Sequence, residues 1–304
     1  MLEICNLENT PRSALSISKA ILDLVDAFLG LKYLAVILLG SIGGLVLATS
    51  GILLGDALNS TLSQSDWRKL EFVSIIYAAN PLLQQSFIIS CLAIGFLSAA
   101  CLIFRRSWLS FITSRKQFSS GLFLAGLALF SITNLVVIFS VTTAPSSDSP
   151  LTFYKDWRHA AFFCVLVVAY AAPMALAEDI LFRGWLVKFS REINSKSLLF
   201  VFGSSVLFSV AHLQWDLASL VLRFASGLAY AWAVMRLGGL EFSFGAHLGK
   251  NTVLVWLLGQ SGQFDWKYSY EIAVYTNVVG SIGLILMVET FIRLRQVKID
   301  RRQH

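Results

Sequence analysis

Long apolar runs alternate with short polar segments through almost the whole chain. Most of these runs are close to the length of about 20 residues at which an α-helix crosses a bilayer. Between residues 13 and 29 the apolar positions instead recur at helical spacing opposite Lys19, Asp23 and Asp26, which predicts an amphipathic helix in the membrane interface. The pattern predicts eight membrane-spanning helices after it, at about 31–54, 86–104, 118–141, 159–187, 197–213, 218–236, 243–259 and 271–292.

Composition supports this interpretation. Hydrophobic residues make up 56% of the 304 residues, charged residues only 14%, and the mean hydropathy is +0.70. Soluble domains carry about 25% charged residues. The sequence therefore predicts an all-α polytopic membrane protein. We divide it into a leader at 1–30, three helices within 31–150 and five helices within 151–304.

The net charge of +6 is explained by membrane topology. Most of the 24 Lys and Arg residues lie at the N-terminus, in the loops after the second, fourth and sixth helices, and in the tail. These segments share one side of the membrane if eight helices span it. The positive-inside rule then places both termini in the cytoplasm, and the basic residues give no reason to predict nucleic-acid binding.

A few polar residues interrupt the apolar helices of the second half. Ionisable groups inside a membrane are costly and usually have a function. The fourth helix holds two acids and an arginine, the fifth a histidine, and the seventh a histidine and an amide: Glu178, Asp179, Arg183, His212, His247 and Asn251.

Helical spacing separates these residues into roles. Asp179 and Arg183 are four residues apart, which predicts an ion pair within the helix. Glu178 points about 100° away and is left as a free carboxylate that can exchange protons with water.

The other two helices add partners for this carboxylate. His247 and Asn251 share one helix face, and Phe208 places an aromatic ring beside His212 four residues later. If these helices converge, their side chains can activate a water and stabilise an oxyanion.

The three spacings resemble the signature motifs of the CPBP (Abi) family of intramembrane proteases. The motifs are Glu178-Asp179-x-x-x-Arg183, Phe208-x-x-x-His212 and His247-x-x-x-Asn251, and the resemblance covers about residues 157–259. That family includes type II CAAX prenyl endopeptidases and bacteriocin-processing or self-immunity proteins.

The resemblance implies an endopeptidase that acts on a membrane-associated protein or peptide, prenylated or not. It implies that Glu178 activates water with help from His212, that His247 and Asn251 form the oxyanion site, and that Arg183 holds the acidic motif. Asp179, Arg183 and Phe208 are then supporting residues. Asp179 stands where the family usually has a second glutamate.

Several alternatives stay open. Water can be activated by a glutamate–histidine pair alone, or by a Zn²⁺ held by Glu178, His212 and His247. A non-catalytic immunity or peptide-binding protein would use the same cavity as a receptor. A proton-coupled transporter ranks lower, because the second and third helices contain no ionisable residue.

Two features of the pattern resist this scheme. Counted at 1.5 Å per residue from the cytoplasmic ends, His247 lies roughly 10 Å deep, Glu178 about 15 Å and His212 about 22 Å. Lys250 has two explanations: it extends to the interface, or it pairs with an acid of the fourth helix.

Overall fold

The computed structural model describes residues 28, 30–53, 80–142, 156–184, 197–258 and 274–300. Their helices begin with Gly30–Leu53. They continue with α3 (Asn80–Phe104), η3 (Trp108–Phe111), α4 (Ser120–Thr142), α5 (Trp157–Asp179), η4 (Ile180–Gly184), α7 (Ser197–Val210), α8 (Leu217–Leu237), α9 (Glu241–Leu258), η6 (Tyr275–Val279) and α11 (Gly280–Asp300). The described residues contain no β-strand, so the all-α prediction is confirmed.

Each of the eight predicted runs contains a helix. Six of the described helices are long and apolar enough to cross a membrane, and they match the first four, the sixth and the eighth predictions. The other two are α7, with 14 residues, and α9, with 18 residues and several polar side chains. Large apolar side chains such as Leu102 and Leu217 point outward at 78% and 77% exposure, which suits contact with lipid. The protein is therefore an integral membrane protein.

Two earlier predictions are not tested. The interfacial helix predicted at 13–29 lies almost entirely outside the described residues. The division at residues 30 and 150 also stays a prediction.

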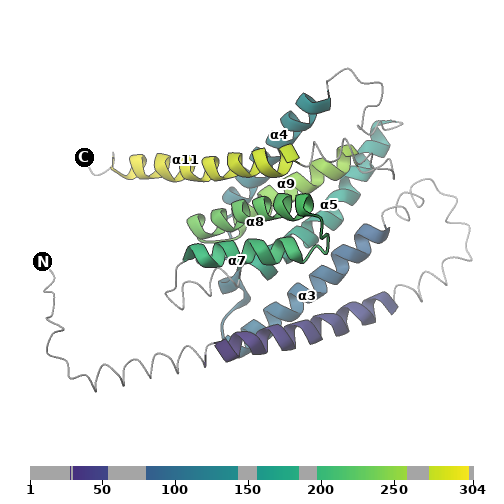
Figure 1. Cartoon of the computed structure of the whole chain (residues 1–304), viewed down its shortest axis with the longest axis vertical. Helices are drawn as coiled ribbons and strands as arrows, with labels where there is room; N and C mark the ends of the chain where they lie inside the picture. Colours follow the sequence, from purple (N-terminus) through teal and green to yellow (C-terminus); the bar gives the residue numbers. More distant parts are fainter. Residues whose placement is uncertain are drawn as a thin grey trace, which may run out of the picture.

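Glycine allows the helices to approach closely at two places. In the first, Gly40 and Gly44 of helix 30–53 face Gly95 of α3, and the two helices lie side by side in Figure 1. In the second, Gly245 and Gly249 of α9 lie against the backbone of α4. A small residue repeated every four positions is a common packing surface in membrane helices. These contacts fix α9 against α4.

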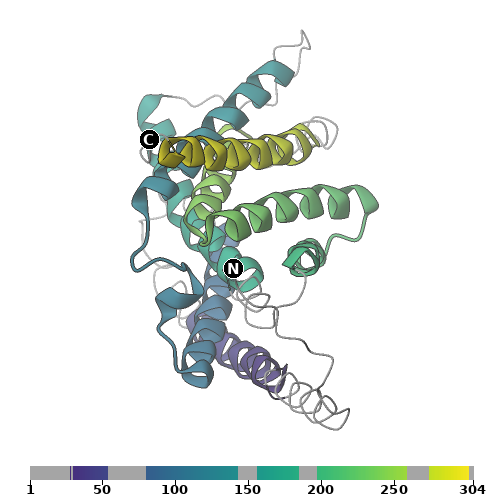
Figure 2. The same cartoon turned by 90° about the vertical axis from the view of Figure 1, so that its left-hand side faces the viewer.

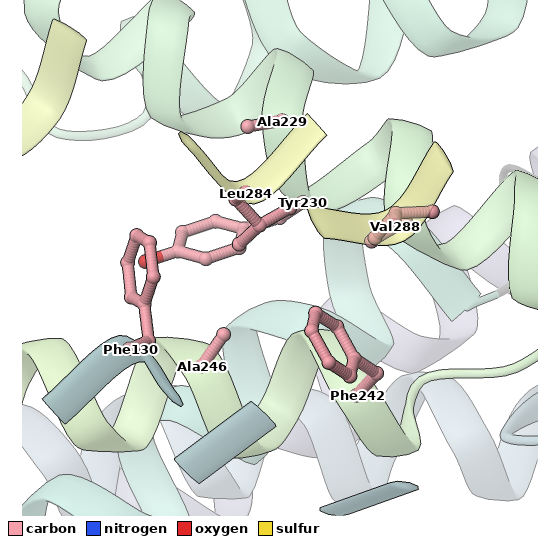
Figure 3. Packing of buried hydrophobic residues seen from close by; sticks show 8 residues of the cluster. Phe130, Ala229, Tyr230, Phe242, Ala246, Leu284 and Val288 are labelled. Atoms are coloured by element: carbon pink, nitrogen blue, oxygen red, sulfur yellow. The ribbon is translucent and has the colours of Figure 1, made fainter. Parts of the chain in front are cut away.

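The core that supports α9 is built from four helices. Figure 3 shows Phe130 of α4, Tyr230 of α8, Phe242 and Ala246 of α9 and Leu284 of α11 packed together. The rings of Phe130 and Tyr230 meet edge to face at 6.1 Å. Helices α8 and α11 run in a similar direction in both overall views (Figures 1 and 2). The core therefore holds Tyr230 in place next to α9.

A buried carboxylate joins α9 to the loop before α4. Glu241, at 0% exposure, accepts a hydrogen bond from Thr113 Oγ1 at 2.8 Å and pairs with Arg115 at 3.3 Å. Ser114 N–H donates to the carbonyl of Gly238 at 2.9 Å, and Gly238 ends α8 with a φ of 74° that suits glycine. The loops that follow the second and sixth predicted spans thus lie together, and the predicted topology places both on one side of the membrane.

Substitution of Gly245 tests the close packing of α9. A Cβ at this position would overlap the carbonyl oxygen of Phe123, so Gly245→Ala should destabilise the protein by about 1–3 kcal/mol. Thermal unfolding in detergent measures the effect. Gly283→Ala in α11 is the matched control, because its Cβ would meet no atom within 4 Å. Equal melting temperatures for the two variants would contradict this packing.

Candidate active site

A cavity of about 800 Å³ lies among α3, α5, α7, α8, α9 and η6. One face of α5 and one face of α9 line this cavity: Tyr170, Met174 and Glu178 on α5, and His247, Lys250 and Asn251 on α9. These positions recur at intervals of three and four residues, as expected for one helix face. Phe208 and His212 line the same cavity. The structure therefore brings together the four residues predicted to be catalytic.

His212 reaches the cavity although residue counting placed it deeper than Glu178. It lies in the turn just after α7, which ends at Val210. Figure 1 shows α7 running at an angle to α5, so equal counts along the two helices do not mean equal depth. The ring contacts Phe208 edge to face at 4.7 Å, as the four-residue spacing predicted.

One hydrogen bond fixes the His212 ring. Its Nδ1 lies 2.7 Å from the carbonyl oxygen of Phe208. A carbonyl only accepts hydrogen bonds, so Nδ1 carries a proton, and in the neutral form of the ring the lone pair is on Nε2. His212 can therefore accept a proton from a group in the cavity.

Behind the cavity lies the predicted ion pair. Arg183 Nη1 donates to Asp179 Oδ1, and both side chains are at 0% exposure. The Arg183 guanidinium lies between two rings, 4.3 Å from the centroid of Phe208 and 4.8 Å from that of Tyr230. Cation–π contacts of this kind compensate for lost hydration. Asp179 does not line the cavity.

The local backbone helps to place Arg183. The chain changes from α-helix to the π-helix η4 directly after Asp179, and Arg183 is its fourth residue. A second π-helix, η6, contributes Asn277 to the cavity. Short π-helices are frequent at functional sites because they change the direction in which side chains point.

His247 joins the two acids. Its Nε2 lies 3.5 Å from Glu178 Oε2, and its Nδ1 lies 3.4 Å from Asp179 Oδ1. The ring also stacks on Tyr230 with centroids 4.9 Å apart. Both contacts are long for hydrogen bonds, which is common in catalytic sites without substrate. Glu178, His247 and Asp179 thus form one continuous polar chain from the cavity to Arg183.

The pattern of residues alone did not identify Tyr230 or the partners of Lys250. Lys250 forms neither of the two contacts expected for it. It is buried at 7% exposure, and its Nζ donates to Ser226 of α8 and to Asn277 of η6. Ser226 and Tyr230 are four residues apart, and this spacing was the available signal that they share a helix face.

At the mouth of the cavity Asp216 begins α8. Its side chain accepts a hydrogen bond from Ser219 N–H, and this bond lowers the pKa of the exposed Asp216 carboxyl. This part of the cavity wall is therefore negatively charged at neutral pH.

The arrangement of metal-binding side chains bears on the zinc alternative. Among the described residues, no group of three or more His, Cys, Asp or Glu side chains is placed to hold a metal ion. Glu178, His212 and His247 do not form such a group as they are arranged, and the chemistry below uses only side chains of the chain.

The comparison with protein families comes to the same part of the chain. The model of the family "Type II CAAX prenyl endopeptidase Rce1-like" matches residues 159–253. This segment extends from α5 into α9 and contains all three motifs. Neither the curated proteins nor the solved structures gave a match. The resemblance predicted from the motifs is thus confirmed over this segment, which is similar to CAAX-type intramembrane proteases.

The buried ion pair makes a testable prediction. Arg183→Met removes the counter-charge of a fully buried carboxylate, which should destabilise the protein by about 3–5 kcal/mol. Asp179→Asn in the same chain removes the stranded charge, so the double variant should regain much of the lost melting temperature. The measurement is thermal unfolding of both single variants and the double variant. Strictly additive losses would show that the two residues do not act as a pair.

Proposed function

We propose that the protein is an intramembrane endopeptidase that hydrolyses a peptide bond with a water activated by Glu178. The observation that carries the proposal is the cavity itself, in which Glu178, His212, His247 and Asn251 meet. Glu178 is only 6% exposed, and burial of a carboxylate costs free energy. Such groups in a membrane protein usually have a function. The family match over residues 159–253 supports peptide-bond hydrolysis as that function.

Glu178 is the general base in this proposal. It takes a proton from water as the water oxygen attacks the substrate carbonyl, which gives a tetrahedral oxyanion. Asp179, held by Arg183, lies beside His247 Nδ1 and keeps the ring oriented with its Nε2 toward Glu178. Protonated Glu178 can then donate to His247, and the two groups hold the proton between them.

The remaining residues complete the reaction. The Asn251 amide donates to the oxyanion, and the imidazolium form of His247 adds a second donor. His212 lines the same cavity with an available Nε2 and assists the transfer of a proton from water or to the leaving nitrogen. When the intermediate collapses, the C–N bond breaks and the proton held between Glu178 and His247 ends on the released amine.

Asp179 at the place of the usual glutamate is compatible with this mechanism. Its contacts are to Arg183 and His247, and it does not line the cavity. A shorter acid at this position changes the support of the site and leaves the wall of the cavity unaltered. The position of Asp179 therefore does not favour the non-catalytic receptor over the enzyme.

The substrate in this proposal is a membrane-associated protein or peptide, which enters a cavity between membrane helices. We also propose the orientation with both termini in the cytoplasm. The contact between the loops near Thr113 and Gly239 supports it, because the positive-inside rule assigned both loops to that side.

Replacement of Glu178 tests the mechanism. Glu178→Gln keeps the shape of the side chain but cannot accept the proton, so cleavage of a peptide substrate by the purified protein should fall by roughly 10²–10⁴-fold. Asp156→Asn is the control on the same helix: Asp156 caps α5 at its far end, and asparagine also caps helices. The proposal is wrong if folded Glu178→Gln protein cleaves as fast as the Asp156→Asn control.

A further inference from the structure

Lys250 is a buried cation whose hydrogen-bond partners carry no charge. Its ammonium group donates to Ser226 Oγ at 3.1 Å and to Asn277 Oδ1. Ser226 Oγ itself donates to Asn277 Oδ1 at 2.7 Å. An ammonium group has three N–H donors, and these contacts use two of them. All three residues line the cavity that contains Glu178.

A second cation lines the same cavity one helical turn away from Ser226. Arg223 of α8 donates from Nη2 to Gln214 Oε1, while its buried Nη1 has no hydrogen-bond partner. Neither Arg223 nor Lys250 forms an ion pair with any residue that the structure describes. The cavity thus has two positive groups with unused donors.

The two acids of the cavity wall attract these cations from a distance, but among the described residues they form no salt bridge with either of them. Glu178 lies against His247, and Asp216 caps α8 through Ser219. Two cations in a cavity of low polarity repel each other, and an anion bound between them would offset this electrostatic repulsion. A carboxylate suits both, because lysine and arginine bind it through charge-assisted hydrogen bonds.

We propose that Lys250 and Arg223 form a subsite for a carboxylate group of the peptide substrate. This inference rests on the proposed endopeptidase function and adds the chemical feature by which the substrate is recognised. The carboxylate has two sources, the free C-terminus of the peptide or an acidic side chain near the cleaved bond. Lys250 lies next to Asn251 and three residues after His247, so the subsite is about one helical turn from the reacting groups.

Binding to an inactive variant separates this subsite from catalysis. The full chain with Glu178→Gln is mixed with a fluorescent apolar hexapeptide in three forms: with a free C-terminal carboxylate, with a C-terminal amide, and with the amide plus one internal aspartate. The free acid should bind at least about tenfold more tightly than the plain amide. Equal affinities for these two forms mean that the source is not the C-terminus.

Tight binding of the aspartate-containing amide instead identifies an acidic side chain as the source. If neither carboxylate binds more tightly than the plain amide, the subsite does not exist.

Three variants show whether these two cations are responsible. Lys250→Met and Arg223→Met should each remove most of the preference for the carboxylate form over the plain amide. Arg236→Met is the control, because Arg236 pairs with Glu289 outside the cavity. Binding of the plain amide verifies that each variant is folded. Arg223 is more exposed than Lys250, so Arg223→Met tests the subsite even if Lys250→Met does not fold.

The proposal is overturned if folded Lys250→Met and Arg223→Met proteins keep the full preference. This outcome differs from a failure of the proposed function. The proposed function fails if the Glu178→Gln protein still cleaves the peptide, whatever its binding preference.

Discussion

The ion pair between Asp179 and Arg183 is the interaction on which the site depends. Both side chains are completely buried in a part of the chain that is otherwise apolar. Such a pair persists only where its charges balance and where its surroundings compensate for the lost hydration. The rings of Phe208 and Tyr230 enclose the guanidinium from α7 and α8, and His247 of α9 contacts the carboxylate. The pair therefore determines how four segments of the chain meet.

Because of this pair, the adjacent acids Asp179 and Glu178 have different positions and different roles. Asp179 points to Arg183 and His247, whereas Glu178 lines the cavity beside the other nitrogen of His247. A histidine between a fixed carboxylate and a free one can exchange a proton with the free one without moving. Asp179, which stands where the family usually has a glutamate, therefore supports the site and does not itself line the cavity.

Spacing along single helices allowed much of the fold and part of the site to be predicted. The apolar runs located the helices, and four-residue spacings predicted the Asp179–Arg183 pair and the contact between Phe208 and His212. Contacts between helices could not be predicted in this way, because spacing says which residues share a face but not what that face meets. The contacts of His247 with both acids, for example, could not be predicted from spacing. The partners of Lys250, and the burial of Glu241 against Thr113, depend in the same way on contacts between distant segments.

The claim that Glu178 is the reagent of a membrane protease is tested most directly by its products in cells. Membrane proteomes of cells that make the natural chain are compared with those of cells that make Glu178→Ala protein at the same level. We predict a set of new peptide termini in membrane-associated proteins that is present with the natural chain and absent with the variant. The same termini at the same abundance in both samples would contradict the account.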